Sequence, residues 1–223
     1  MGDRTKTVTH IRNLIVQRKP DAKTLLELAC GTGAILQGLA KYYDVAGLDA
    51  SSAMLAIARK KLPRIHLVQK NMVTFSLGRK FDVIICVFDS INHVLKFRDW
   101  KRIFQRVALH LTPGGLFLFD INTEAKLKRL VRAPIWVNKF GRNIELINIT
   151  GARGGISNWN VKVFEPQTRH RYQLFEENVK EISFPVNKIR EALQQQFHAV
   201  KIIDPKGGRL SNNSDRLYFA CKR

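Results

Sequence analysis

The stretch Thr24-Leu-Leu-Glu-Leu28, followed at once by Ala29-Cys-Gly-Thr-Gly33, decides the fold of this chain. A short apolar run that leads into a glycine loop, and then into the helical pattern of residues 34–42, is typical of a strand–loop–helix unit. The glycines let a bound molecule approach the backbone, and the free N–H groups at the start of the helix attract an anionic group. We therefore predict that this loop is part of a binding site.

The alternation of strand and helix continues on both sides of this loop. The run 81–87 is almost continuously apolar, as expected for a strand that is buried on both faces. Such an order predicts an α/β fold with a doubly wound, mostly parallel sheet. The expected strands are 44–49, 65–68, 81–87 and 116–119, the expected helices are 7–19, 52–62 and 98–111, and a turn is expected at Thr112–Gly115.

The pattern changes after Asp120. A short basic helix at 124–132 is followed by stretches in which β-branched and aromatic residues alternate with polar ones, at 143–150, 156–165 and 171–184. We predict a small antiparallel β insertion over residues 133–184, after the fifth strand, within a single domain that spans 1–223. A helix at 185–196 and closing strands at 198–203 and 216–221, joined by Gly207-Gly208 and Ser211–Ser214 links that suit a hairpin, complete a seven-stranded sheet.

Composition restricts the classes of protein. The chain has 38 Lys and Arg against 18 Asp and Glu, a formal net charge of +20. This charge fits either an RNA partner or an ordinary solvated surface, and composition alone does not decide between them. No apolar run approaches the roughly 20 residues of a membrane span. The first residues hold no secretory signal, and the cysteines form no Cys-x-x-Cys pair, so we expect a cytoplasmic protein with no membrane partner and no metal site.

Asp49 narrows the identity of the bound molecule. An acidic residue at the tip of the second strand can accept hydrogen bonds from both hydroxyls of a ribose, which indicates a ligand that contains a nucleoside. A dinucleotide site requires a third glycine, where this chain has Leu36, and no phosphate-binding P-loop pattern is present. A nicotinamide dehydrogenase is therefore disfavoured.

Five stretches, taken together, resemble the motifs of the class I S-adenosylmethionine (SAM)-dependent methyltransferases, and cover most of residues 24–122. The fourth-strand run Phe88-Asp-Ser-Ile-Asn-His93 is similar to that of sugar-amine and other small-molecule N-methyltransferases. This resemblance implies a Rossmann-like methyltransferase sheet, SAM as cofactor and S-adenosylhomocysteine as its product. The five stretches are Leu26–Gly33, Gly47–Leu55, Val68–Met72, Phe81–His93 and Leu111–Asp120.

The resemblance also implies roles for individual residues. Residues of the first motif are expected around the methionyl part of SAM, and Asp49 on the ribose hydroxyls. Ala50, Met54, Asn71 and Met72 are expected around the adenine. The carbonyl of Val87 is expected at the methionine amino group. Asn71 stands where the family more often has Asp, and its amide oxygen can still accept a hydrogen bond. The expected cofactor-binding residues are Glu27, Ala29, Cys30, Gly31, Thr32, Gly33, Asp49, Ala50, Met54, Asn71, Met72 and Val87.

The acceptor side is predicted from position. Methyl transfer to an amine requires that the amine first lose a proton, and a base with a pKa near neutrality assists this step. His93 follows the fourth strand, and we predict that it is the general base or orients the acceptor. Four further polar residues, Asp89, Asn92, Asp120 and Asn122, are predicted substrate contacts. The insertion is expected to cover this side of the sheet and shape the acceptor pocket.

Three functions remain open at this point. The first is methyl transfer to nitrogen or oxygen of a small molecule. The second is methylation of RNA, favoured by the charge, although no RNA-binding module is evident and no amino-adenine motif follows the fourth strand. The third is a non-catalytic SAM-binding subunit. Only residues 1–23 precede the first strand, so we expect a reduced N-terminal cap and a more exposed cofactor. Exposed strands of the insertion are expected to allow a homodimer.

Overall fold

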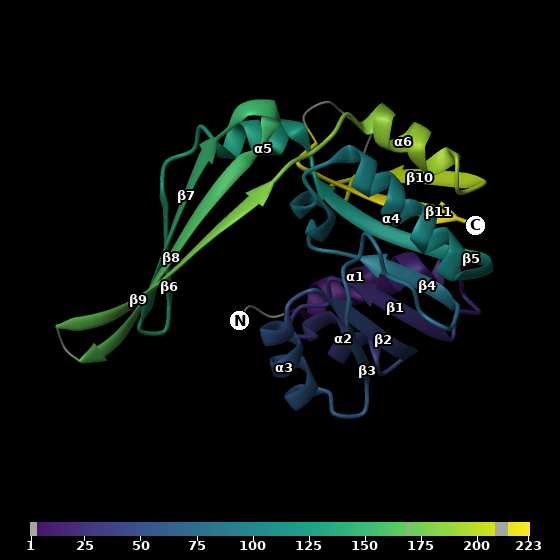
Figure 1. Cartoon of the computed structure of the whole chain (residues 1–223), viewed down its shortest axis with the longest axis horizontal. Coiled ribbons are helices and arrows are strands. Elements are labelled where there is room, and N and C mark those ends of the chain that lie inside the picture. Colours follow the sequence, from purple (N-terminus) through teal and green to yellow (C-terminus); the bar gives the residue numbers. More distant parts are fainter. Residues whose placement is uncertain (1–3, 169, 208–213) are drawn as a thin grey trace.

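The computed structural model describes residues 4–168, 170–207 and 214–223. It consists of an α/β body from which a long, twisted ribbon of strands projects (Figure 1). The sheet of the body has seven strands in the order β10-β11-β5-β4-β1-β2-β3. The predicted seven-stranded, mostly parallel sheet with an antiparallel insertion is therefore confirmed.

Strands β3, β2, β1, β4 and β5 run parallel, and β11 is antiparallel to both β5 and β10. The carboxyl ends of the parallel strands therefore meet at one edge, where α/β proteins place their ligand sites. The strands are β1 (Thr24–Leu28), β2 (Asp44–Asp49), β3 (His66–Gln69), β4 (Phe81–Cys86), β5 (Leu111–Asn122), β10 (Ala199–Ile203) and β11 (Arg216–Lys222).

Helices cover both faces of this sheet. The apolar side chains of α1, α2 and α3 pack in one cluster with Leu25, Val83 and Ile85, whereas those of α4 and α6 pack in another with Leu26 and Ile84. Within the described ranges, no helix has the length and apolarity needed to span a membrane. The helices are α1 (Thr5–Val16), α2 (Ala34–Leu39), α3 (Ser52–Lys61), α4 (Phe97–His110), α5 (Glu124–Leu130) and α6 (Val186–Gln194), with the 3₁₀ turns η1 (Ser90–His93) and η2 (Arg153–Gly155).

The insertion forms a separate antiparallel sheet in the order β6-β7-β8-β9. We call it the arm: β6 (Trp136–Phe140), β7 (Asn143–Gly151), β8 (Ser157–Thr168) and β9 (Arg171–Glu181). Strand β6 was not expected from the sequence. It is short, lies at the edge of the sheet, and its sequence Trp-Val-Asn-Lys-Phe does not alternate apolar with polar residues. Its pairing with β7 is set by the tight link at Gly141, whose φ of +60° suits glycine.

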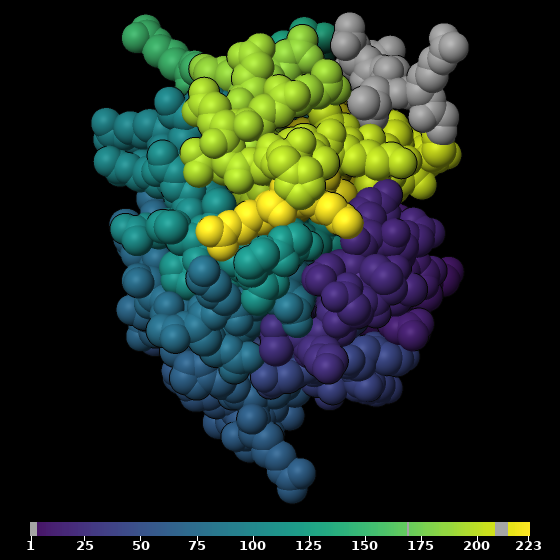
Figure 2. All heavy atoms as spheres, turned by 90° about the vertical axis from the view of Figure 1, so that its right-hand side faces the viewer, coloured from purple at the N-terminus to yellow at the C-terminus, as the bar shows by residue number. Residues whose placement is uncertain are grey.

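The predicted turn at Thr112–Gly115 is wrong, because these residues belong to the start of β5. Gly114 N–H donates to the Arg223 carbonyl at 3.1 Å, and Arg223 N–H donates to the Gly115 carbonyl at 3.0 Å. The C-terminal residue thus pairs with this segment by backbone hydrogen bonds, as a neighbouring strand does. In Figure 2 the C-terminal residues, in yellow, lie between the purple N-terminal segment and the yellow-green segment.

Other differences are shifts of element ends. The first helix ends at Val16 rather than Lys19, and the second at Leu39 rather than Tyr42. Residues 208–213 of the link between the two closing strands, which hold most of the expected Gly207-Gly208 and Ser211–Ser214 turns, lie outside the described residues. Gly207 has a φ of +76°, and its N–H donates to the Asp204 carbonyl at 3.0 Å.

Gly47, in the middle of β2, generates a stability prediction. A Cβ at this position would lie 2.6 Å from Leu36 Cδ1, 2.8 Å from Cys30 Sγ and 2.9 Å from Leu67 Cδ2. We expect Gly47→Ala to lower the free energy of unfolding by about 1–3 kcal/mol, since overpacking forces its neighbours apart. Gly78→Ala is the control, because its Cβ would meet nothing within 4 Å. Urea denaturation checks both; equal stability of the two variants would contradict the prediction.

Candidate active site

The loop after β1 has an unusual backbone. Ala29, Gly31 and Gly33 have φ values of 54°, 53° and 74°, in the left-handed region. Glycine adopts this region readily, whereas Ala29 does so at an energetic cost. Strained backbone conformations of this kind are common at functional sites. The N–H of Cys30 donates to the Leu48 carbonyl at 3.0 Å, which fastens the loop to the end of β2. The loop is thereby held open at the carboxyl edge of the sheet.

Asp49 joins the tips of β1 and β2. Its Oδ2 accepts the Gly31 N–H at 2.8 Å, and its Oδ1 accepts the Ser51 N–H at 2.8 Å. A carboxylate oxygen can accept more than one hydrogen bond, so Asp49 keeps acceptor capacity toward a ligand. The contact of Asp49 with ribose hydroxyls stays a prediction, for which this acceptor capacity is available.

A cleft of about 680 Å³ opens beside this carboxylate, within the ~300–1,000 Å³ typical of small-molecule sites. It brings together residues from the loops after β1, β2, β3 and β4, together with Glu177 of the arm. Of the predicted cofactor and catalytic residues, those that line it are Ala29, Gly31, Asp49, Ala50, Met54, Asn71, Met72 and His93.

The other predicted cofactor residues do not line this cleft. Thr32 faces a neighbouring hollow between α1 and α2, and Gly33 caps α2. The Val87 carbonyl accepts the Ser90 hydroxyl at 2.7 Å. Glu27 and Cys30 are buried under the loop. Their roles toward a cofactor remain predictions.

Burial governs the titration of Glu27 and Cys30. Desolvation raises the pKa of Glu27 well above its usual range, although the Leu36 N–H opposes this shift. Desolvation, with the nearby Glu27 and Asp49 carboxylates, raises the pKa of Cys30 to about 12. Because the thiolate is the reactive form, Cys30 is not a nucleophile at neutral pH.

A buried ionic network lies at the ends of β4, β5 and β11. The Arg216 guanidinium bonds to the carboxylates of Asp89 and Asp120, and to Asn122 Oδ1 at 3.1 Å. Asp120 also accepts the Asp89 N–H at 3.1 Å. Desolvation raises the pKa of Asp120 to about 6, although the charge of Arg216 acts in the opposite direction.

Asn92 serves the fold rather than the substrate. Its side chain is fully buried, and its Nδ2 donates to the Asn122 carbonyl at 3.0 Å and the Ile182 carbonyl at 2.7 Å. Its Oδ1 accepts the Asn122 N–H at 3.1 Å. With every amide atom bonded to backbone, the predicted substrate contact by Asn92 is corrected: this residue ties β5 to the chain that leaves the arm.

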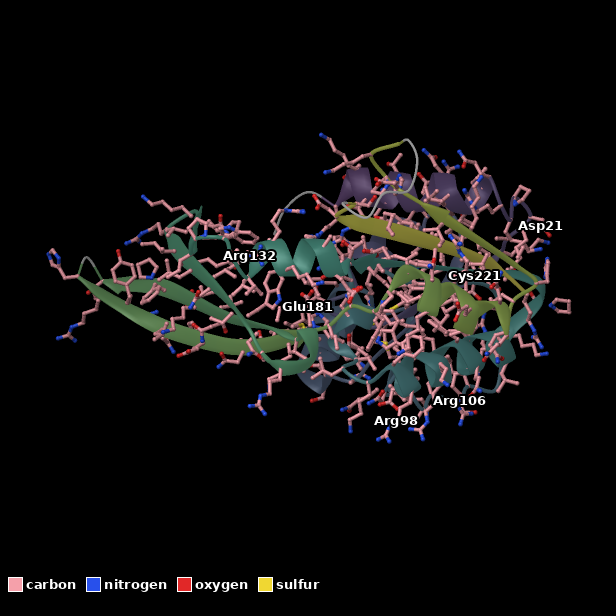
Figure 3. The ribbon with its side chains drawn as sticks, turned by 90° about the horizontal axis from the view of Figure 1, so that it is seen from above. Asp21, Arg98, Arg106, Arg132, Glu181 and Cys221 are labelled. Atoms are coloured by element: carbon pink, nitrogen blue, oxygen red, sulfur yellow. The ribbon has the colours of Figure 1, made fainter. Side chains whose placement is uncertain are left out.

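The root of the arm adds charged groups that sequence reasoning missed. Glu181 Oε2 accepts the Asn122 Nδ2 at 2.9 Å, and Lys126 Nζ donates to Asn122 Oδ1 at 2.7 Å. One side-chain oxygen or nitrogen atom from each of Asp89, His93 and Glu181 lies within 4.8 Å of the other two. Figure 3 places Glu181 where the arm meets the body. A charged residue next to an apolar stretch was the available signal, both for Glu181 and for Arg216.

Part of the chain is similar to known methyltransferases. Residues 25–115 match a family model described as a methyltransferase domain. The dTDP-3-amino-3,4,6-trideoxy-alpha-D-glucopyranose N,N-dimethyltransferase of Streptomyces venezuelae is 37% identical over 119 residues, which cover 53% of this chain and 50% of that protein. The chain spans about half or less of the length of the curated relatives of this type that it matches.

Solved structures agree with the observed fold. An S-adenosylmethionine-dependent methyltransferase from Clostridium acetobutylicum superposes with a TM-score of 0.87 at 23% identity, covering 99% of this chain and 92% of that one. The sugar N-methyltransferase KedS8 from Streptoalloteichus superposes with a TM-score of 0.81 at 25% identity, covering 97% and 86%. The resemblance that the sequence motifs predicted is confirmed.

The ionic network predicts a pH-dependent loss of stability. Removing the guanidinium in Arg216→Ala leaves the buried Asp120 carboxylate and the half-buried Asp89 carboxylate without that partner, which costs about 3–5 kcal/mol. Because the pKa of Asp120 lies above that of an unfolded aspartate, the native state binds the proton more tightly, and stability falls as pH rises through that pKa. We therefore expect the loss in Arg216→Ala to be larger at pH 8 than at pH 5.

Chemical denaturation at the two pH values measures this difference. Arg98→Ala is the control, because Arg98 points outward from α4 (Figure 3) with 68% of its side chain exposed. We expect a change within about 0.5 kcal/mol for this variant. A loss in Arg216→Ala that is the same at both pH values would show that the carboxylates are not its cause.

Proposed function

We propose that this chain, whose residues 25–115 match a methyltransferase domain, binds SAM in the cleft beside Asp49 and transfers its methyl group to the amine nitrogen of a small molecule. Amino sugars are the acceptors named for three of its relatives, and we propose the same class here. S-adenosylhomocysteine is then the second product.

The residues around the cleft fit this cofactor. Asp49 offers free acceptor capacity at the tip of β2, where the ribose hydroxyls are expected. A Cβ added at Gly31 would meet no protein atom within 4 Å, so the loop leaves open space there for a ligand. Met54, 42% exposed, and Met72 offer apolar surface for an adenine ring. When bound, SAM supplies an electrophilic methyl group, and the chain's task is alignment of the acceptor.

The single observation that carries the choice of acceptor is the charge of the cleft. In a chain with a net charge of +20, its lining has three carboxylates, from Asp49, Asp99 and Glu177, against the one ammonium group of Lys70. An amine is protonated near neutral pH and is attracted by carboxylates, whereas the phosphates of RNA are repelled. The lining of the cleft thus favours a cationic acceptor, opposite to what overall composition suggests.

His93 is our proposed general base. Its side chain is exposed and lines the cleft beside Val94 and Ser90. From there the imidazole can accept the proton that the acceptor amine must lose before it attacks. Asp89, Asp120 and Asn122 act behind His93: through Arg216 and Glu181 they hold the loop after β4 against β5 and the root of the arm.

The arm is our proposed substrate cover within a single 1–223 domain. Side chains at alternate positions of β9 share one face, so the face that carries Glu177 also carries Val179 and, across the ladder, Trp159. The rings of Trp159 and Trp136 meet edge to face at 6.3 Å. This largely apolar face, which reaches the cleft through Glu177, suits the ring of a small acceptor.

Further proposals concern partners and location. Large apolar side chains are exposed by 48–61% on the arm and suit a homodimer in which arms pair. The free, buried thiols of Cys30, Cys86 and Cys221 favour a cytoplasmic location. A non-catalytic SAM-binding subunit remains the alternative if no acceptor is methylated. The exposed large apolar side chains of the arm to which this refers are Val137, Phe140, Tyr172, Leu174 and Phe175.

SAM binding tests the cofactor site. We expect Asp49→Ala to weaken binding of SAM and S-adenosylhomocysteine by about 10- to 100-fold, since hydrogen bonds to a charged group contribute ~1.5–3 kcal/mol. Asp44→Ala is the control: Asp44 lies at the opposite end of β2 and pairs with Arg79 on the surface. Isothermal titration calorimetry measures both variants. Unchanged affinity in Asp49→Ala, or tighter binding of NAD than of S-adenosylhomocysteine by the wild type, would refute the assignment.

The acceptor class is tested by following the methyl group. Purified protein receives labelled SAM with dTDP-3-amino-3,6-dideoxy-alpha-D-glucopyranose and related amino sugars, or with a cell extract that is then separated by size, with and without ribonuclease. We expect label in small molecules, at a rate that changes little with salt. Ribonuclease-sensitive label in the large fraction, falling steeply with ionic strength, would establish RNA as the substrate instead.

A further inference from the structure

The arm holds His93 in place through its backbone. The Nδ1 atom of His93 lies 3.1 Å from the Lys180 carbonyl oxygen of β9. A carbonyl oxygen can only accept a hydrogen bond, so Nδ1 carries the hydrogen and, in the neutral ring, Nε2 is left free to take a proton. The tautomer of the proposed base is therefore set by an element that lies 87 residues away in the sequence.

The residue after Lys180 places a carboxylate beside the same ring. Glu181 is 4% exposed. One oxygen of its carboxylate, one ring nitrogen of His93 and one carboxylate oxygen of Asp89 lie within 4.8 Å of one another. Asn122 Nδ2 fixes one of its oxygens at 2.9 Å. Asp89 is in turn held by Arg216. Two carboxylates thus lie near the ring of His93.

The surroundings of Glu181 make the pKa of its carboxyl group depend on neighbouring charges. Desolvation is the main cause that raises its pKa, and the neighbouring Asp89 carboxylate adds to the rise; the Asn122 hydrogen bond, His93 and Lys126 act in the opposite direction. Arg216 faces the group from β11 through Asn122 and Asp89. A carboxylate that is buried in this way gains most when a positive charge appears next to it.

We propose that Glu181 is a positioning residue of the reaction: with Asp89, its carboxylate stabilises the protonated ring of His93 after that ring has taken the proton of the acceptor amine. This proposal rests on the function proposed above. It assigns a chemical task to the root of the arm, in addition to its task of covering the acceptor.

The step balances as follows. The acceptor R–NH₃⁺ gives one proton to Nε2 of His93, leaving R–NH₂ and a ring that carries one positive charge. The amine nitrogen then bonds to the methyl carbon with its freed electron pair, the carbon–sulfur bond breaks, and that electron pair stays on the sulfur of S-adenosylhomocysteine. The product is R–NH₂–CH₃⁺. The ring of His93 releases its proton to water at its exposed edge.

Glu181→Gln tests the proposal, because glutamine keeps the size of the side chain and can still accept from Asn122 while it removes the charge. At pH 7 we expect kcat/KM for the amine to fall about tenfold or more, since an adjacent charge shifts the proton affinity of a base by one unit or more. The acidic limb of the pH–rate profile should move to lower pH. Above the pKa of the amine the two rates should converge, because the acceptor then needs no base.

Glu176→Gln is the matched control. Glu176 precedes Glu177 on β9, so its side chain lies on the opposite face of the arm, where it pairs with Lys162. It loses the same charge and should keep the wild-type rate and pH profile. SAM affinity and thermal stability are measured for both variants, and Glu181→Asp, which restores a carboxylate, should recover part of the rate.

A readout without turnover separates this proposal from the proposed function. The His93 ring is titrated by proton NMR, its signal assigned by its absence in His93→Asn, and we expect it to lose its proton at lower pH in Glu181→Gln than in the wild type. Equal titration in the two proteins would overturn the role of Glu181, whatever the acceptor proves to be. A wild type that methylates no amine but shows the shift would overturn only the proposed function.

Two further outcomes would also overturn the role of Glu181. One is a uniform loss of rate at every pH in Glu181→Gln that Glu181→Asp does not recover, since this describes a purely structural residue. The other is a wild-type reaction that EDTA abolishes and Mg²⁺ restores, because Asp89, His93 and Glu181 would then be holding a cation.

Discussion

The pairing of the Arg216 guanidinium with the buried Asp120 carboxylate and the half-buried Asp89 carboxylate is the interaction on which the proposed acceptor side depends. Without Arg216, the Asp89 and Asp120 carboxylates would repel each other at the ends of β4 and β5, and the loop between β4 and η1 would lose the ion pair of Asp89. That loop has Phe88 and Asp89 in the left-handed region, at φ values of 59° and 50°, a conformation that such residues hold only when their surroundings compensate the cost. Once the loop is held, η1 presents His93 to the cleft and buries Asn92 against the arm.

The arm and the body meet through polar contacts rather than through a shared apolar core. Asn92 exchanges two hydrogen bonds with Ile182, and Asn122 bonds to Glu181. Each of these bonds lies at the root, whereas the far end of the arm extends away from the body (Figure 1). These directional hydrogen bonds therefore fix the orientation of the root of the arm, around Glu181 and Ile182, relative to the body. This division explains how a projecting ribbon of strands can contribute Glu177 to the cleft wall and Lys180 to the orientation of His93.

Much of this organisation could be predicted from the sequence, and each feature that could not be predicted has a physical reason for this. The apolar runs and the glycine loop predicted β1 to β5 and the residues around Asp49, because those signals are local. The network around Arg216 could not be found in this way, since its members come from β5, β11 and the loop after β4 and meet only after folding. Asn92 was misassigned for the same reason: a polar residue in a strand-end motif fits a ligand contact or a buried backbone partner equally well, and only the position of Ile182 distinguishes them. The sequence of strand β6, Trp-Val-Asn-Lys-Phe, lacked the alternation of apolar and polar residues that marks a half-buried strand.

The ladder between β8 and β9 also limits how this chain can change in length. Side chains alternate between the two faces of a strand, so losing or gaining one residue between Glu177 and Glu181 would send Glu177 to the opposite face of the arm. Residues added around the hairpin end, beyond Thr168 and Arg171, leave the register of Glu177, Lys180 and Glu181 as it is. An insertion or deletion of an even number of residues between Glu177 and Glu181 would therefore keep Glu177 on its face of the arm, and an odd number would not. The outer part of the arm can change in length without altering the cleft. In the last residues of β9, the alternation of side chains fixes which residues face the cleft.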